Sequence, residues 1–141
     1  MIHYYELRWL IEEFHKSWKS GCRIESRPAQ AADNLERLAV ITAQVAVRLL
    51  QLRSVAEAKP EQPCDCILTR DEWHCLWSTV EHTKRIPRKP PTVLWALRAI
   101  AKLAGWRDTK QTGRIGWATL WNGWSKFEDR VAGWKLAKEV G

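Results

Sequence analysis

The chain has 141 residues and a hydrophobic fraction of 45%, which fits one domain with a buried core. Its 23 lysine and arginine residues outnumber 16 aspartate and glutamate residues, and the net charge of +7 favours a polyanionic partner, nucleic acid before membrane. We find neither an apolar run of about eighteen residues nor a signal-peptide pattern, so we expect a soluble, cytoplasmic protein with no membrane partner. Strand-like alternation is missing throughout, which predicts an all-α fold of about five helices.

The first helix is expected over residues 4–19, with Ser20-Gly21 ending it. Apolar residues recur in it at three- and four-residue steps and predict one buried face: Tyr4, Leu7, Ile11, Phe14 and Trp18.

A second set in the same helix follows the same steps: Tyr5, Arg8, Glu12 and Lys19. At about 100° per residue these four fall within about 60° of one another, about a quarter turn from the apolar face. A carboxylate is a hard ligand for Mg²⁺, and guanidinium, ammonium and phenol groups all bind phosphate oxygens. The alternative is a solvated helix face with an ordinary Arg8/Glu12 pair, which spacing alone would favour.

The spacing Tyr5-x-x-Arg8-x-x-x-Glu12-x6-Lys19 resembles the YREK signature of bacterial cut-and-paste DDE transposases of the insertion-sequence and transposon-five type. The likeness is close over roughly residues 4–53 and returns from about 92 to 138. It includes the runs Ile11-Glu12-Glu13-Phe14-His15-Lys16, Asp33-Asn34-Leu35-Glu36-Arg37 and Val45-Ala46-Val47-Arg48-Leu49-Leu50-Gln51-Leu52.

This resemblance implies that Glu12 is the last carboxylate of a Mg²⁺ (or Mn²⁺) site in a ribonuclease-H-like domain. It further implies that Tyr5, Arg8 and Lys19 contact transposon-end DNA, with Asn34 as a further contact. The family's two Asp residues precede the signature and have no counterpart in this chain. One carboxylate cannot clamp two ions, so we expect the chain to bind no metal alone and to cleave no DNA unaided. The apolar face of the first helix, which covers a sheet in the family, must then find another cover or stay exposed.

Residues 22–32 are expected to form a connector, in which Arg23 either extends the phosphate-binding track or is a solvated charge. Asp33 should cap a long central helix through about Leu52, with Asn34 in its first turn either capping or contacting DNA. We therefore divide the chain into residues 1–27, the terminal catalytic-domain helix and connector, and residues 28–141, a helical dimerisation domain.

Residues 54–67 contain two prolines and no periodicity, and predict a loop. Thr69 and Glu72 form a capping box that starts a third helix, and Thr92 caps a fourth, which Gly105 ends. Between these helices lies the basic, proline-rich segment 84–91, which is either a soluble linker or a contact to the DNA backbone.

Four cysteines, Cys22, Cys64, Cys66 and Cys75, raise the question of a metal site. Cys64-x-Cys66 followed by His74-Cys75 has zinc chemistry, but the spacing is narrower than that of closed zinc sites, and adjacent helical residues point about 100° apart. We expect reduced thiols, with zinc as the alternative.

The last helix is expected from residue 113 or 114 to about 140, with an aromatic stripe of three- and four-residue spacing. Gly116, Gly123 and Gly133 would weaken a lone helix and indicate close approach of another backbone. We expect Trp117 and Trp121 to be core residues, and the outer part to be a dimer seam formed by Trp124, Phe127, Val131 and Trp134. The resemblance also implies self-association through the C-terminal helices.

Three functions follow from these patterns. The first is a transposase C-terminal fragment that is inactive alone. The second is an inhibitory partner that forms mixed dimers with full-length transposase. The third is a basic helical DNA-binding protein unrelated to transposition. We favour the first.

Overall fold

The computed structural model describes residues 2–25, 32–109 and 113–140, and in those ranges it is helical with no strand. Five α-helices follow in order: α1 (Ile2–Glu25), α2 (Ala32–Ala58), α3 (Arg70–Glu81), α4 (Val93–Leu103) and α5 (Trp117–Val140). A short 3₁₀ turn, η1 (Cys64–Cys66), precedes α3. The predicted all-α class and the number of helices are confirmed.

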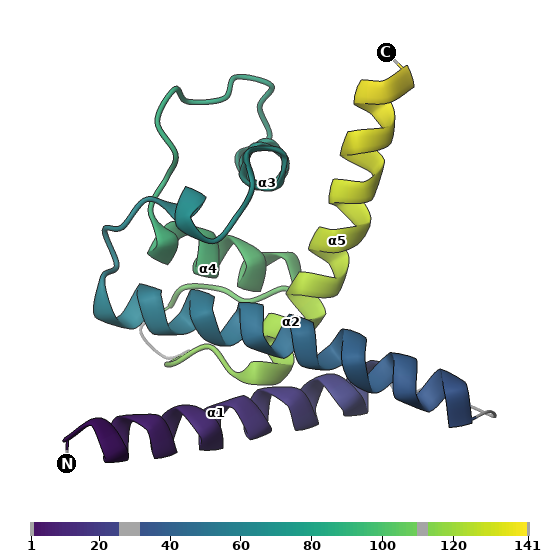
Figure 1. The fold of residues 1–141 in the computed structure, drawn as a ribbon. Coiled ribbons are helices and arrows are strands. Elements are labelled where there is room, and N and C mark those ends of the chain that lie inside the picture. The colour runs from purple at the N-terminus through teal and green to yellow at the C-terminus, as the bar shows by residue number, and fades with distance from the viewer. Residues whose placement is uncertain (1, 26–31, 110–112, 141) are drawn as a thin grey trace.

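Helices α1 and α2 lie side by side and run in opposite directions along one end of the molecule (Figure 1). Helix α5 starts against α1, passes α4 and ends beside α3, with its last turns projecting from the body. The core lies where α2, α3, α4 and α5 meet, and its largest fully buried side chains are Trp124, Phe127, Leu49, Leu52, Leu68, Leu76, Ile100 and Leu120. Helix α1 packs directly on α2 and α5. The division of the chain at residue 27 stays a prediction.

Helix α1 does not end at Ser20-Gly21 but continues to Glu25. Gly21 is buried, and a Cβ atom there would collide with the indole ring of Trp121. The glycine is therefore a packing residue that admits a large aromatic ring, whereas we had expected it to end the helix.

Three other boundaries also differ from the prediction. Helix α2 begins at Ala32, so Asp33 lies inside it, and it extends through Ala58 into the predicted loop because Ala56 is buried in the core. Helix α5 begins only at Trp117, so Gly116 precedes it. The cap predicted at Asp33 is therefore wrong, but those of α3 and α4 are confirmed: Thr69 and Glu72 form the reciprocal box, and the Thr92 hydroxyl accepts from the Trp95 N–H.

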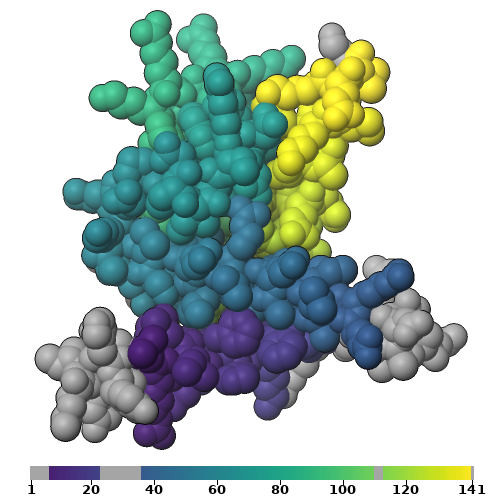
Figure 2. All heavy atoms as spheres, viewed as in Figure 1, coloured from purple at the N-terminus to yellow at the C-terminus, as the bar shows by residue number. Residues whose placement is uncertain are grey.

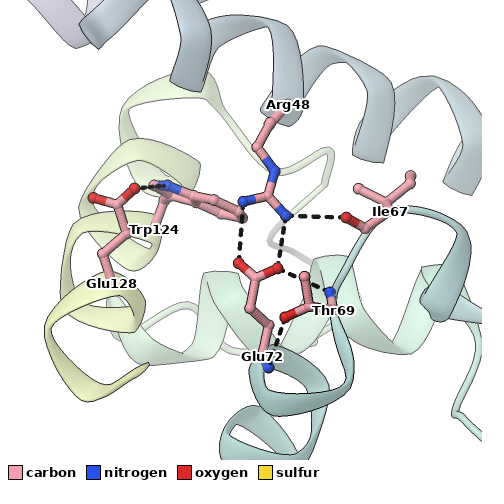
Figure 3. A network of polar contacts seen from close by, with 6 residues as sticks. All are labelled: Arg48, Ile67, Thr69, Glu72, Trp124 and Glu128. Atoms are coloured by element: carbon pink, nitrogen blue, oxygen red, sulfur yellow. Dashed lines mark hydrogen bonds and ion pairs between the residues drawn. The ribbon is translucent and has the colours of Figure 1, made fainter. Parts of the chain in front are cut away.

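A polar network joins α2, α3 and α5 (Figure 3). The Arg48 guanidinium donates to both carboxylate oxygens of Glu72, at 3.0 and 2.8 Å, and to the carbonyl oxygen of Ile67 at 3.0 Å. Its other side lies over the Trp124 ring, 4.9 Å from the centroid. Glu72 also accepts from the Thr69 N–H at 2.9 Å, so a single carboxylate both caps α3 and ties it to α2.

The network predicts an acid-sensitive contribution to stability. Burial alone would raise the pKa of the Glu72 carboxyl, but hydrogen bonds from Arg48 and Thr69 outweigh it and lower the pKa below its usual value. A lowered pKa means stability that is present above the ordinary value near 4.5 and lost as the pH falls through the folded-state pKa. We expect the stability advantage of wild type over Glu72→Gln, measured by urea unfolding, to shrink between neutral pH and about pH 3. An advantage that stays constant with pH would contradict this assignment.

Among the described residues, one helical segment, Glu36–Ala58 of α2, is long and apolar enough to pass a hydropathy test for a membrane span. Leu49 and Leu52 of this segment are fully buried in the core, whereas Val40 and Ile41 are each 58% exposed, and a single helix of this kind also occurs in soluble proteins. The segment is therefore weak evidence for a membrane span and consistent with a soluble protein.

Candidate nucleic-acid interface on helix α1

Two indole N–H groups of α5 fix the orientation of α1. Trp117 Nε1 donates to Glu13 Oε2 at 3.1 Å, and Trp121 Nε1 donates to Ser17 Oγ at 3.2 Å. Glu13 and Ser17 are only 5% and 0% exposed. With Gly21 they form an inward row at four-residue spacing, so the buried face of α1 is built from polar and small residues.

The predicted apolar face of α1 is only partly buried, which corrects our expectation. Phe14 and Trp18 pack against the core, and Trp18 Nε1 donates to Thr42 Oγ1 at 3.0 Å. Leu7 and Ile11, however, are each 57% exposed. The helix is rotated relative to the prediction because the inward row turns toward α5.

This rotation places Arg8, Glu12 and Lys19, here called the α1 edge, on the side of the helix away from α5. All three side chains are exposed, as the helical spacing requires. Arg8 Nε lies 3.3 Å from Glu12 Oε1, and this exposed pair contributes only about 0.3–0.5 kcal/mol. Helix α1 lies along the lower end of the molecule, where its surface is open (Figure 2).

The structure does not describe the side chains of the other predicted DNA contacts. Tyr5 and Arg23 belong to α1 and Asn34 to α2, but their side chains lie outside the described residues. Their roles stay predictions.

The donor set at Glu12 does not fit a magnesium site by itself. Mg²⁺ sites use one or more carboxylates with waters and substrate phosphates, and catalytic pairs of ions need several carboxylates. The described residues hold no group of three or more His, Cys, Asp or Glu side chains that could share a metal ion. We therefore derive no catalytic step for this chain.

The four cysteine thiols are free. Burial raises the pKa of the Cys64 thiol to about 12, with Asp65 adding to the effect, and burial also raises the pKa of the Cys75 thiol. Burial therefore disfavours the thiolate form of both side chains.

A buried arginine, which we did not predict from the sequence, packs on one of the two indoles that hold α1 in place. Arg53, 3% exposed, donates to the carbonyl oxygen of Ile115 and stacks on the Trp117 ring at 3.9 Å. Burial, and then the positive charge of Arg114, lower the pKa of Arg53 to about 10, so it remains a cation. Stacking holds the indole whose N–H group meets Glu13. The only feature of the sequence that could have indicated its burial is its position, which falls on the same face of α2 as the buried apolar residues.

The predicted dimer seam is mostly the chain's own core. Trp124, Phe127 and Val131 are 2%, 1% and 8% exposed, so they are not available to a second copy in this fold. Trp134 is half-buried, and beyond it Leu136 and Val140 are 61% and 81% exposed. The aromatic stripe was attributed to a dimer because sequence spacing cannot distinguish packing within a chain from packing between chains.

A search of the chain against models of known protein families found no match.

Proposed function

We propose that the chain is the C-terminal part of a cut-and-paste DDE transposase, which contacts transposon-end DNA through α1 and cleaves no DNA unaided. One observation carries the proposal: Arg8, Glu12 and Lys19 share one exposed edge while the opposite side of α1 is fixed to α5. An edge held in this way presents a guanidinium and an ammonium to a phosphate backbone without rotation of the helix. The resemblance to the YREK signature is our reason for proposing the transposase family, and the net charge of +7 supports a nucleic-acid partner.

In this proposal Glu12 is the last carboxylate of a magnesium (or manganese) site whose other ligands come from elsewhere. Leu7 and Ile11, exposed beside it, are the apolar surface that a neighbouring catalytic element would cover. Self-association, as a homodimer or with a full-length transposase, would use the exposed end of α5 around Leu136 and Val140. Since DNA lies in the cytoplasm of bacteria, a fragment of a bacterial transposase would act in the cytoplasm.

The proposal predicts that DNA binding depends on the α1 edge. With the full chain and a labelled duplex of about 30 base pairs, we expect Arg8→Ala/Lys19→Ala to weaken binding about tenfold near 0.1 M salt. The slope of log K against log salt should fall by about 1–2, because each lost phosphate contact removes about 0.9. Fluorescence anisotropy measures both quantities.

The matched control is Lys102→Ala/Arg107→Ala, which removes two exposed cations from another part of the chain. Equal losses in both variants would contradict the proposal and favour an unrelated basic DNA-binding protein. A nuclease assay with Mg²⁺ or Mn²⁺ should show no cleavage, and cleavage that Glu12→Ala abolishes would refute the statement that the chain is inactive alone.

A further inference from the structure

The segment between α3 and α4 carries positive charge that the chain does not neutralise. Residues 82–91, here called the basic loop, contain four exposed cations: Lys84, Arg85, Arg88 and Lys89. Within the described residues none of the four has an ion-pair partner, whereas Arg48, Arg98, Arg114 and Lys138 each do. Four unpaired charges within six positions repel one another, and an anionic partner relieves that repulsion.

The basic loop is held against the body at several points. Trp77 Nε1 donates to the carbonyl oxygen of Arg85 at 3.2 Å, and the Cys64 N–H donates to the carbonyl oxygen of Pro91 at 2.8 Å. Ile86 packs against the core. Three prolines restrict the backbone further. A partner therefore meets cations whose backbone is already ordered, which lowers the entropy cost of binding.

The loop faces a pocket that extends its positive surface onto α3. The pocket has a volume of about 620 Å³, and its polar lining comes from Arg70, His74, Arg88, Thr69 and Asp65. Burial is the main cause that lowers the pKa of His74, and the charges of Arg70 and Lys138 lower it further against the opposing charge of Asp71. The carboxylates on this side are Asp65, Glu81 and Asp71, and since Asp71 is paired with Lys138, they are too few to balance the cations.

The character of this surface favours a duplex backbone over a membrane or a single strand. None of the large apolar side chains exposed in the described residues belongs to residues 59–109, so this surface offers no anchor for a bilayer. Single strands bind to exposed aromatic platforms, but Trp73 is buried, and Trp77 and Trp95 pack on each other at 5.1 Å. Arginines and lysines without such platforms suit the regularly spaced phosphates of duplex DNA.

We propose that the basic loop, together with Arg70 and His74, forms a second surface that binds the phosphate backbone of duplex DNA without sequence preference. It stands at the opposite end of the molecule from α1, and its long side chains project from the body (Figures 1 and 2). The inference does not depend on the proposed function, because it uses none of the residues of the α1 edge. With both surfaces in use, one chain could hold two DNA segments, or two stretches of one bent duplex.

The test is a salt titration of duplex binding by the full chain with Lys84, Arg85, Arg88 and Lys89 changed to Gln. We expect at least a tenfold loss of affinity near 0.1 M salt and a salt slope lower by about 2–4. The matched control changes Lys102, Arg107, Lys126 and Arg130, also two lysines and two arginines and all exposed, to Gln. Circular dichroism and thermal melting confirm that each variant is folded.

An unchanged slope in the loop variant, or equal losses in both variants, would overturn the inference. So would tighter binding of an RNA duplex than of DNA with the same dependence on the loop. Loss in the loop variant with no loss in Arg8→Ala/Lys19→Ala supports this surface while the proposed function fails. Loss in Arg8→Ala/Lys19→Ala with no loss in the loop variant would refute DNA binding by the basic loop and support binding by the α1 edge.

Discussion

Replacing Glu72 by alanine is expected to lower the free energy of unfolding by about 3 kcal/mol. The substitution leaves the Arg48 guanidinium, about one-third exposed, between Ile67 and Trp124 without its counter-ion. Removing one partner of a buried pair costs about 3–5 kcal/mol, and the partial exposure of Arg48 places this case at the lower end. The loss of the reciprocal cap on α3 adds to the cost. Urea unfolding at pH 7 measures the change.

Two further variants separate the pair from its surroundings. Glu128→Ala removes an exposed carboxylate that accepts from Trp124 Nε1 at 2.7 Å in the same network, and should cost no more than about 1 kcal/mol. Arg48→Met/Glu72→Leu removes both charges and should be clearly more stable than Glu72→Ala alone. If Glu72→Ala unfolds within about 0.5 kcal/mol of wild type, the network does not hold α3 to α2.

Local sequence signals were sufficient for much of this fold. Thr69 with Glu72, and Thr92, were identified as caps because such hydrogen bonds span only three residues and need no tertiary information. The grouping of Arg8, Glu12 and Lys19 on one edge also follows from helical spacing alone. The side chains of these three residues are exposed, whereas that of Tyr5, the fourth member of the predicted set, lies outside the described residues, and the site itself remains a prediction.

The orientation of α1 could not be predicted, because it depends on partners far away in the chain. Leu7 and Ile11 are more apolar than Glu13 and Ser17, so hydrophobic periodicity predicted that Leu7 and Ile11 are buried and missed the burial of Glu13 and Ser17, although Phe14 and Trp18 of the predicted face do pack against the core. The indoles that reverse this choice lie 104 residues further on. Leaving a buried indole N–H group without an acceptor costs free energy, and a carboxylate and a hydroxyl on α1 accept from these two indoles. The same limit explains why the buried aromatic residues of α5 were attributed to a dimer.

The glycines of α5 give the second large effect, because two of them, ten residues apart in one helix, should respond in opposite directions. A Cβ atom at Gly123 would collide with the carbonyl oxygen of Ile100, a backbone atom of α4 that cannot rotate away, whereas nothing lies within 4 Å of a Cβ atom at Gly133. We expect Gly123→Ala to lower the free energy of unfolding by about 2 kcal/mol, since overpacking costs more than the gain in helix propensity. Gly133→Ala should raise it by about 0.5–1 kcal/mol through that propensity alone.

Thermal and urea unfolding of the two variants give the comparison directly. Stabilisation by both substitutions would mean that α4 and α5 are further apart than described, and the inward row of α1, which depends on the position of α5, would then lose its support.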